Sequence, residues 1–249
     1  MYKIAVQLWS LQEKTALDFE NTLKTVGKMG YDGVEFAGFG DIDATKMKKL
    51  LDENGLKSAG AHIGLDELEN NFDNIVEYCK IIDNKRIVCP ISFFESYDDC
   101  VKNHNRLCAI SDKLKKENII MSYHNHGNEF RVYNGMYAND IIVGDDNKID
   151  YEVDVYWTTY SNVDTINYLK KVGRRCSLIH LKDMQICADG NKKDITFGDG
   201  ILEHKKILST ADEFCKPDWL IIEWEGFGDM DAFDAVKRGL DNLKELLNL

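Results

Sequence analysis

Four apolar segments in the second half of the sequence each end at a side chain of a type that binds metal ions. They are residues 119–123 before His124, 149–153 before Asp154, 176–179 before His180 and 219–222 before Glu223. Intervals of 30, 26 and 43 residues separate these four side chains. Each interval leaves room for one helix and one strand.

If these segments are strands of one parallel barrel, the four side chains lie at the same mouth, because the carboxyl ends of barrel strands share one face. Two histidines and two carboxylates suit a divalent transition metal. The sequence therefore predicts a metalloenzyme with one divalent ion (Mn, Zn, Co or Mg) and four metal ligands, which are His124, Asp154, His180 and Glu223.

Each residue taken alone has a simpler interpretation. A histidine after an apolar segment is often a hydrogen-bonded structural residue, and Asp154 is equally well placed to cap the next helix. Glu223 is harder to explain in this way, because residues 219–224 are otherwise apolar and no Lys or Arg is close in sequence. A buried carboxylate without a cation is costly, so Glu223 favours the metal site.

The densest polar segment is residues 123–130. Alternate residues of a strand share a face, so His124 and His126 both point inward. We assign His124 as a metal ligand, and His126 as a general acid–base or as a hydrogen-bonding partner of a ligand. Glu129 is an alternative carboxylate ligand or base from the same loop.

Other strand ends supply candidates for substrate binding and catalysis. Trp9 and Trp157 are placed to stack on a sugar ring, with core packing as the alternative. Lys182 is placed to neutralise a developing oxyanion, with an ion pair to Asp183 or Glu225 as the alternative. The remaining candidates are Glu35 and Glu225 for substrate binding and His62 for catalysis.

A repeated unit must position these side chains: an amphipathic helical stretch, a Gly or Asn that ends the helix, and a short apolar strand. Strands are expected at 3–9, 33–36, 57–62, 86–91, 119–124, 149–154, 176–181 and 218–224. Helices are expected at 16–29, 43–54, 66–82, 97–117, 160–172, 200–214 and 229–248, with a poorly patterned one at 137–143. This alternation over 249 residues predicts an α/β protein with a single (β/α)₈ TIM barrel spanning 1–249. Residues 183–200 form a candidate lid, or a surface loop.

Composition restricts the partners. A net charge of −12 disfavours nucleic acid and anionic membranes, but a small-molecule substrate remains open because a local Lys and a metal can outweigh that field. No apolar stretch approaches membrane-spanning length. Seven cysteines without a Cys-x-x-Cys pair, and no evident signal peptide, make the cytoplasm the expected location.

With these residues in place, the sequence resembles the sugar phosphate isomerase/epimerase family of xylose isomerase-like TIM barrels. The resemblance covers essentially the whole chain. The segments that carry it are 7–10, 30–35, 61–62, 123–126 with 129–130, Asp154 with Trp157, 180–183, 197–200 and 222–223.

The resemblance implies one divalent metal held by Glu, Asp, His and Glu from the last four strands, and pairing of the protein as a homodimer. Asp154, His180 and Glu223 match the last three positions, but His124 stands where the better-known epimerases have Glu. In those enzymes the first and last Glu exchange a proton with the substrate carbon, so here His124 or His126 is left as the partner of Glu223.

Two groups of relatives suggest other activities. Members with the Tyr-His-Asn-His signature include enzymes that act on keto-sugars or cyclitols by elimination or hydration. The apurinic-site endonucleases of this barrel use three metals, and His62 matches one of their ligand positions. However, Trp157 replaces a further His of theirs, and the negative net charge also argues against a role in DNA repair.

The predicted function is a metal-dependent isomerase or epimerase acting on a carbon next to a sugar carbonyl. The predicted catalytic residues are Glu223, His126, Lys182 and His62, and the predicted substrate-binding residues are Trp9, Glu35, Trp157 and Glu225. The alternatives are a lyase, dehydratase or hydratase on a keto-sugar, keto-glycoside or cyclitol, and a non-catalytic protein that binds metal and sugar.

Overall fold

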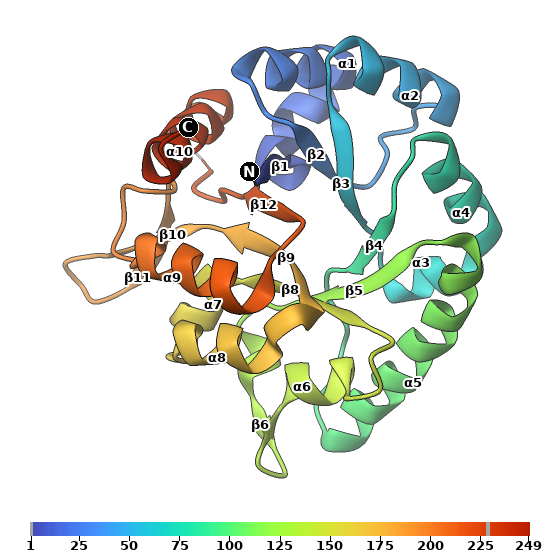
Figure 1. The fold of residues 1–249 in the computed structure, drawn as a ribbon, viewed down its shortest axis with the longest axis vertical. Helices are drawn as coiled ribbons and strands as arrows, with labels where there is room; N and C mark the ends of the chain where they lie inside the picture. Colours follow the sequence, from blue (N-terminus) through green and yellow to red (C-terminus); the bar gives the residue numbers. More distant parts are fainter. Residues whose placement is uncertain (1, 228–229) are drawn as a thin grey trace.

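Eight parallel strands form a closed barrel in the centre of the molecule, which confirms the predicted fold (Figure 1). The computed structural model of the protein describes residues 2–227 and 230–249. The strands pair in the order β1-β12-β9-β8-β5-β4-β3-β2, and β1 pairs with both β12 and β2, which closes the ring. The strands are β1 (Lys3–Gln7), β2 (Gly33–Ala37), β3 (Lys57–His62), β4 (Arg86–Cys89), β5 (Ile120–His124), β8 (Asp150–Asp154), β9 (Cys176–Leu181) and β12 (Trp219–Ile222).

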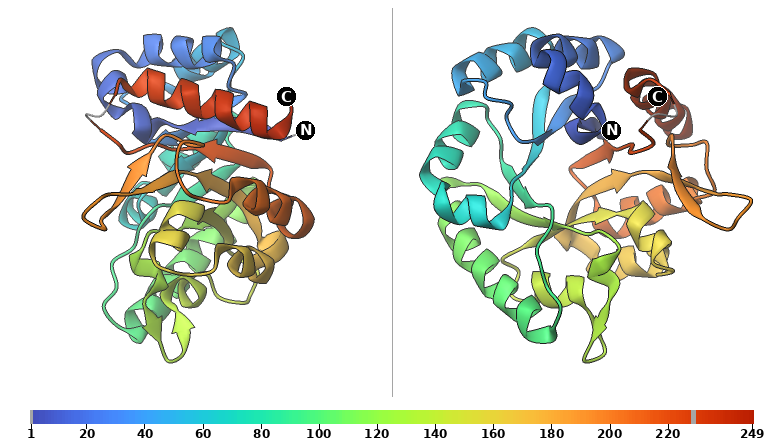
Figure 2. Two further views of the ribbon diagram at one scale, coloured as in Figure 1. Left: turned by 90° about the vertical axis from the view of Figure 1, so that its left-hand side faces the viewer. Right: turned by 180° about the vertical axis from the view of Figure 1, so that it is seen from behind.

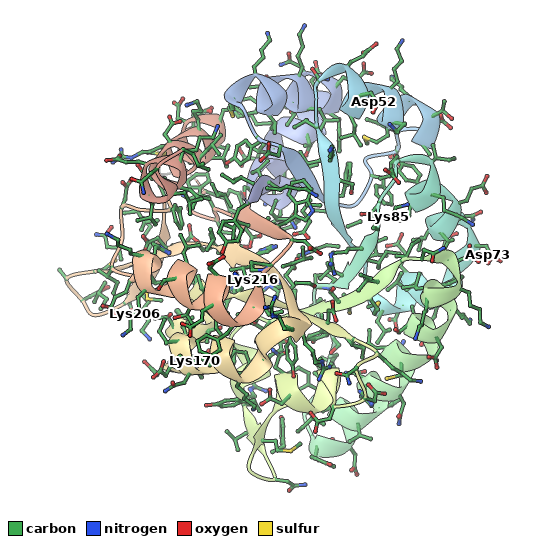
Figure 3. All side chains as sticks on the ribbon, in the orientation of Figure 1. Asp52, Asp73, Lys85, Lys170, Lys206 and Lys216 are labelled. Atoms are coloured by element: carbon green, nitrogen blue, oxygen red, sulfur yellow. The ribbon has the colours of Figure 1, made fainter. Side chains whose placement is uncertain are left out.

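Helices surround the barrel, as the side view and the view from behind show (Figure 2). They are α1 (Gln12–Met29), α2 (Ala44–Glu53), α3 (Leu65–Asn70), α4 (Phe72–Ile81), α5 (Tyr97–Leu114), α6 (Ala138–Val143), α7 (Val155–Tyr160), α8 (Thr165–Val172), α9 (His204–Thr210) and α10 (Ala232–Leu247). Their apolar faces pack on the barrel in one large cluster, while charged side chains such as Asp52 and Asp73 project from the outer helices (Figure 3). None of the helices in the described part of the chain is long and apolar enough to cross a membrane.

Several predicted helix boundaries were wrong. The helix expected at 66–82 is two helices that meet at Asn71, and the one expected at 160–172 is divided between α7 and α8. Helix α1 starts earlier than expected and is kinked at Asp18, whose carboxylate accepts a bond from the backbone N–H of Asn21. The helix expected at 200–214 begins at His204. The expected start of the last helix, residue 229, lies outside the described residues.

Apolar and polar layers share the barrel interior. The apolar layer consists of Ala5, Ala59, Val88, Leu178, Trp219 and Ile221. Gln7, His180 and Glu223 each lie two residues beyond a member of this layer, so they point to the same side of the sheet. The polar side chains therefore rest on a buried apolar layer and face the carboxyl ends of the strands.

The segment after β9 is a hairpin rather than an irregular loop. Strands β10 (Asp183–Ile186) and β11 (Lys192–Ile195) pair antiparallel within the predicted lid, residues 183–200. The Asp183 carboxylate accepts bonds from four backbone N–H groups of Met184, Gly198, Gly200 and Leu202, at 2.8–3.1 Å. Burial would raise the pKa of Asp183, but His204 and these amides lower it overall. Asp183 thus anchors both ends of the hairpin to the barrel.

Replacing this anchor is expected to loosen the hairpin and destabilise the protein. In Asp183→Ala four backbone N–H groups lose their acceptor, so we expect a loss of about 3 kcal/mol in the free energy of unfolding. Asp183→Asn keeps one acceptor oxygen, so its free energy of unfolding should lie between those of the wild type and Asp183→Ala. Urea unfolding measures the loss, and hydrogen exchange locates it. Unchanged protection of the Gly198 and Gly200 amides in Asp183→Ala would contradict this role.

Candidate metal centre

The four predicted ligands meet at the mouth of the barrel. His124 ends β5, Asp154 ends β8, His180 lies in β9 and Glu223 follows β12 directly. All four are buried, and each offers one ligand atom, these atoms lying within 4.8 Å of one another. His180 Nδ1 is 2.9 Å from Glu223 Oε2. The tertiary structure therefore assembles a set of two imidazoles and two carboxylates from four separate strands.

Asp154 serves two purposes at once. Its Oδ1 accepts a bond from the backbone N–H of Trp157 at 3.0 Å and so caps α7. Its Oδ2 is buried and has no hydrogen-bond partner. Burial raises the pKa of Asp154 to about 7, and Glu223 adds to the rise while Lys182 and His180 oppose it. The free oxygen is placed to bind a cation.

A second layer of acidic groups lies against the histidines. Glu152 Oε2 is 3.0 Å from His124 Nδ1 and 2.7 Å from His62 Nε2. Glu35 Oε2 is 2.6 Å from His180 Nε2 and 3.1 Å from His62 Nε2. Glu152 therefore orients the ring of His124, and Glu35 supports the ring of His180 from the Nε2 side, as carboxylates do behind metal-binding histidines.

Glu152 was not among the predicted site residues, although it belongs to this centre. It is fully buried and lies two residues before Asp154 on β8, so the two share a face. This alternation of side chains along β8 could have identified Glu152 from the sequence. His62, His124, Glu152 and His180 also form an overlapping set whose ligand atoms are equally close together.

Charges in this buried layer compensate one another. Burial lowers the pKa of His62, but Glu35 and Glu152 raise it to about 10. The pKa of His180 is likewise raised against its burial, by Glu152, Glu35 and Glu223. Conversely, His62 and His180 hold the pKa of Glu35 well below its usual range despite burial. His62 and His180 are therefore protonated between ionised carboxylates, whereas burial lowers the pKa of His124.

Gly60 leaves room for this network. A Cβ at residue 60 would come within 2.7 Å of Glu35 Oε1. Gln7 Nε2 donates to Glu35 Oε2 at 2.8 Å. Glu35, predicted to bind substrate, thus lies fully buried beneath the ligand set, where it contacts Gln7, His62 and His180.

His126 and Glu129 lie beside the ligand set and differ in their contacts. His126 Nδ1 is buried without a partner, and its ring centroid is 4.8 Å from that of His124. Burial lowers the pKa of His126 to about 4, so its imidazole is neutral at pH 7. Glu129 instead accepts bonds from the His126 backbone N–H at 2.9 Å and the Tyr123 hydroxyl at 3.1 Å, so its oxygens brace the loop.

Lys182 is a buried cation at the edge of the centre. It forms an ion pair with Glu225, its Nζ is 3.5 Å from Glu223 Oε2, and Asp194 of the hairpin lies on another side. Nζ also lies over the rings of Tyr156 and Trp157, at 5.3 and 5.4 Å. Burial lowers the pKa of Lys182, but the surrounding carboxylates raise it overall. The contact with Asp194 could not be predicted, because it depends on the fold of the hairpin.

The two predicted aromatic platforms differ in exposure. Trp9 is 45% exposed in the short helix Leu8–Leu11 that follows β1. Trp157 is partly buried in α7, with its ring 5.6 Å from that of His126. The structure therefore places Trp157 against the metal-site histidines and Trp9 toward solvent.

The donor set fits a divalent transition metal. Imidazole nitrogen and carboxylate oxygen suit Zn²⁺ and Mn²⁺, and the unpaired Asp154 Oδ2 has no other buried partner. The contacts of Glu152 with His124 and of Glu35 with His180 add the outer support that such ligands need. The residues of the site thus meet the requirements of a metal centre.

Comparisons with known proteins agree with this architecture. No curated protein matches the chain. Among solved structures, a sugar phosphate isomerase/epimerase from Parabacteroides distasonis is 24% identical over 98% of this chain and 93% of its own, with a TM-score of 0.78. The IolI protein, solved with a bound zinc atom, is 16% identical over 99% of this chain and 98% of its own, with a TM-score of 0.80.

A third solved structure is named for a different reaction, a dehydration. The probable 3-DHS dehydratase AsbF from Bacillus anthracis is 14% identical over 97% of this chain and 98% of its own, with a TM-score of 0.73. At these identities the likenesses show a shared fold. The model of the xylose isomerase-like TIM barrel family matches residues 23–246, and this chain belongs to that family.

Proposed function

We propose that this protein is a divalent-metal-dependent enzyme that moves a proton on a carbon next to the carbonyl of a small sugar, as an isomerase or epimerase. The convergence of His124, Asp154, His180 and Glu223, with Asp154 Oδ2 unpaired, is the observation that carries the proposal. An ion bound there would polarise the substrate carbonyl as a Lewis acid. The sugar phosphate isomerase/epimerase and zinc-containing neighbours support this assignment.

The proton transfer is assigned to Glu223 and His126. Lys182 and His180 lower the pKa of Glu223 against its burial, so it is ionised and can accept a proton. His126 is neutral and has an unpaired Nδ1, so it is a second group that can accept a proton. The proton returned to the carbon comes from the protonated form of the base that removed it, or from water. This pairing replaces the two-carboxylate arrangement, because His124 occupies the first position.

Lys182 and the aromatic rings orient the substrate. The ammonium group is held by Glu225, Tyr156 and Trp157, so it can neutralise negative charge on a sugar oxygen without first being ordered. Trp157 and, nearer to solvent, Trp9 offer apolar faces to a sugar ring. His62 balances the charge of Glu35 and Glu152 beneath the ligands.

A lyase or dehydratase is the second candidate. Elimination needs the same first step, in which Glu223 removes the proton next to the carbonyl, and the proton then carried by Glu223 can leave with the hydroxyl as water. The dehydratase neighbour supports this alternative. Both activities begin with the same exchange of a proton next to the carbonyl.

Metal binding is expected to release protons and to strengthen with pH. In the metal-free protein Asp154 has a pKa of about 7 and His180 a raised pKa, so below pH 7 both carry a proton that the ion must displace. The dissociation constant of Mn²⁺ should fall at least about tenfold from pH 6 to pH 7, and less steeply above pH 7, where Asp154 is already ionised. Calorimetry in buffers of different ionisation enthalpy counts the protons.

The variant Asp154→Asn tests the same ligand set. It keeps the shape and the cap on α7, but should lose stoichiometric metal by elemental analysis. Retention of the wild-type metal content by Asp154→Asn, or a dissociation constant that is flat between pH 6 and 7, would contradict the proposed site.

Solvent exchange tests the chemistry. With Mn²⁺ in D₂O, a panel of ketoses, aldoses and 3-keto-glycosides should include a substrate that gains deuterium next to its carbonyl, as NMR detects. Glu223→Gln and His126→Asn should each slow this exchange by about 10²–10⁴-fold. Glu203→Gln, an exposed change of the same kind, should leave the rate unchanged.

The products separate the remaining classes. A sugar isomer identifies an isomerase or epimerase, and loss of water identifies a dehydratase. If sugars of the panel bind the metal-loaded protein and none exchanges deuterium, the enzyme proposal fails and the protein is a metal- and sugar-binding protein.

A further inference from the structure

A cluster of three metal-ligating side chains lies on the outer face of the barrel, away from the mouth. His104 and Cys108 are one turn apart on α5, and therefore on the same face of that helix. Asp146 comes from the segment 144–149 between α6 and β8, and α6 lies beside α5 (Figure 1). None of these residues contacts the ligand set of the candidate metal centre.

The spacing of the three side chains matches one metal ion. Cys108 Sγ is 3.5 Å from His104 Nε2, 3.7 Å from His104 Nδ1 and 3.4 Å from Asp146 Oδ2, and His104 Nε2 is 3.7 Å from Asp146 Oδ2. Tetrahedral zinc with its usual bond lengths separates neighbouring N, O and S ligands by about 3.4–3.6 Å. Because Sγ lies over the ring of His104, the Cys108 side chain would have to change rotamer to bind an ion held by His104 Nε2.

The tautomer of His104 suits metal binding. Its Nδ1 is 3.1 Å from the carbonyl oxygen of Ile142. A carbonyl only accepts, so Nδ1 carries the hydrogen and Nε2 presents its lone pair. A backbone carbonyl behind the ring is a common support of metal-binding histidines. This contact does not involve Cys108 or Asp146, and it separately indicates that His104 can bind a metal ion.

The segment that carries Asp146 is already ordered. Arg175 donates to the carbonyl oxygens of Gly144 at 2.6 Å and Ile149 at 2.8 Å, at the two ends of the segment. Lys148 Nζ is 2.6 Å from Asp112 Oδ2 on α5. Gly144 has a φ of +65°, and a Cβ there would lie 2.3 Å from His104 Cε1, so only glycine lets the turn come this close. The segment that carries Asp146 and the ring of His104 therefore need little further ordering to bind an ion.

We propose that His104, Cys108 and Asp146 form a second metal site, which takes a thiolate-binding divalent ion such as Zn²⁺ and leaves its fourth position to water. Binding forms the metal–sulfur bond and releases the thiol proton to the solvent. The ion would link α5 to the segment before β8 and stabilise the folded state. Soft sulfur in the set distinguishes this site from the centre at the barrel mouth, whose ligands are nitrogen and oxygen.

Cobalt is the probe that separates the two sites, because only thiolate ligation gives a sulfur-to-Co²⁺ charge-transfer band in the near ultraviolet. The experiment uses the whole protein carrying Asp154→Asn, which weakens the centre at the mouth. Titration with Co²⁺ should give this band with one equivalent. Cys108→Ser should abolish the band, and Asp146→Asn should weaken Co²⁺ binding about tenfold or more.

Cys187→Ser is the matched control, because Cys187 is a free, partly exposed thiol elsewhere in the chain. It should keep the full band. Zn²⁺ should raise the melting temperature of the Asp154→Asn protein, and Cys108→Ser should remove that rise. Absence of the band at saturating Co²⁺, or its loss in Cys187→Ser but not in Cys108→Ser, would overturn the proposal. Circular dichroism of Asp146→Asn, an exposed change, shows whether the fold is intact.

Discussion

Ionised side chains in the closed barrel can be stable only if they neutralise one another, because water scarcely reaches them. Glu35, Glu152 and Glu223 are almost wholly buried, and the cations that face them are His62, His180 and Lys182. Removing one partner would leave an uncompensated charge, which costs several kcal/mol in a protein interior. The paired rings and carboxylates are consequently held against one another above the buried apolar layer.

This compensation also explains why the centre suits a metal ion. The carboxylates that balance the protonated histidines are the groups that orient the neutral rings once a metal displaces their protons. Asp154 also combines two roles, since one of its oxygens caps α7 and the other has no hydrogen-bond partner and can bind an ion. The helix-cap and ligand interpretations of this residue, which compete when the sequence is read alone, are therefore compatible.

The strand positions could be predicted because a short apolar run and the Gly or Asn before it are local signals of a strand buried on both faces. The helix boundaries were less predictable. Asn71 separates two helices and Asp18 kinks another, in each case within a sequence that is amphipathic throughout. The hairpin after β9 was also missed, because its ends are fixed by Asp183 through amides up to 19 residues away, which no local pattern reveals.

The sequence by itself determined the barrel, the strand that carries each candidate ligand and the departure at His124, because these depend on residue type and alternation along a strand. Only the tertiary structure decided which acidic side chain pairs with which basic side chain. Glu152 pairs with His62 from a strand 90 residues away, Glu35 with His180 across 145 residues, and Asp194 reaches Lys182 only through the hairpin. Ion pairs depend on distances of a few ångströms, and those distances exist only after the ring of strands has closed.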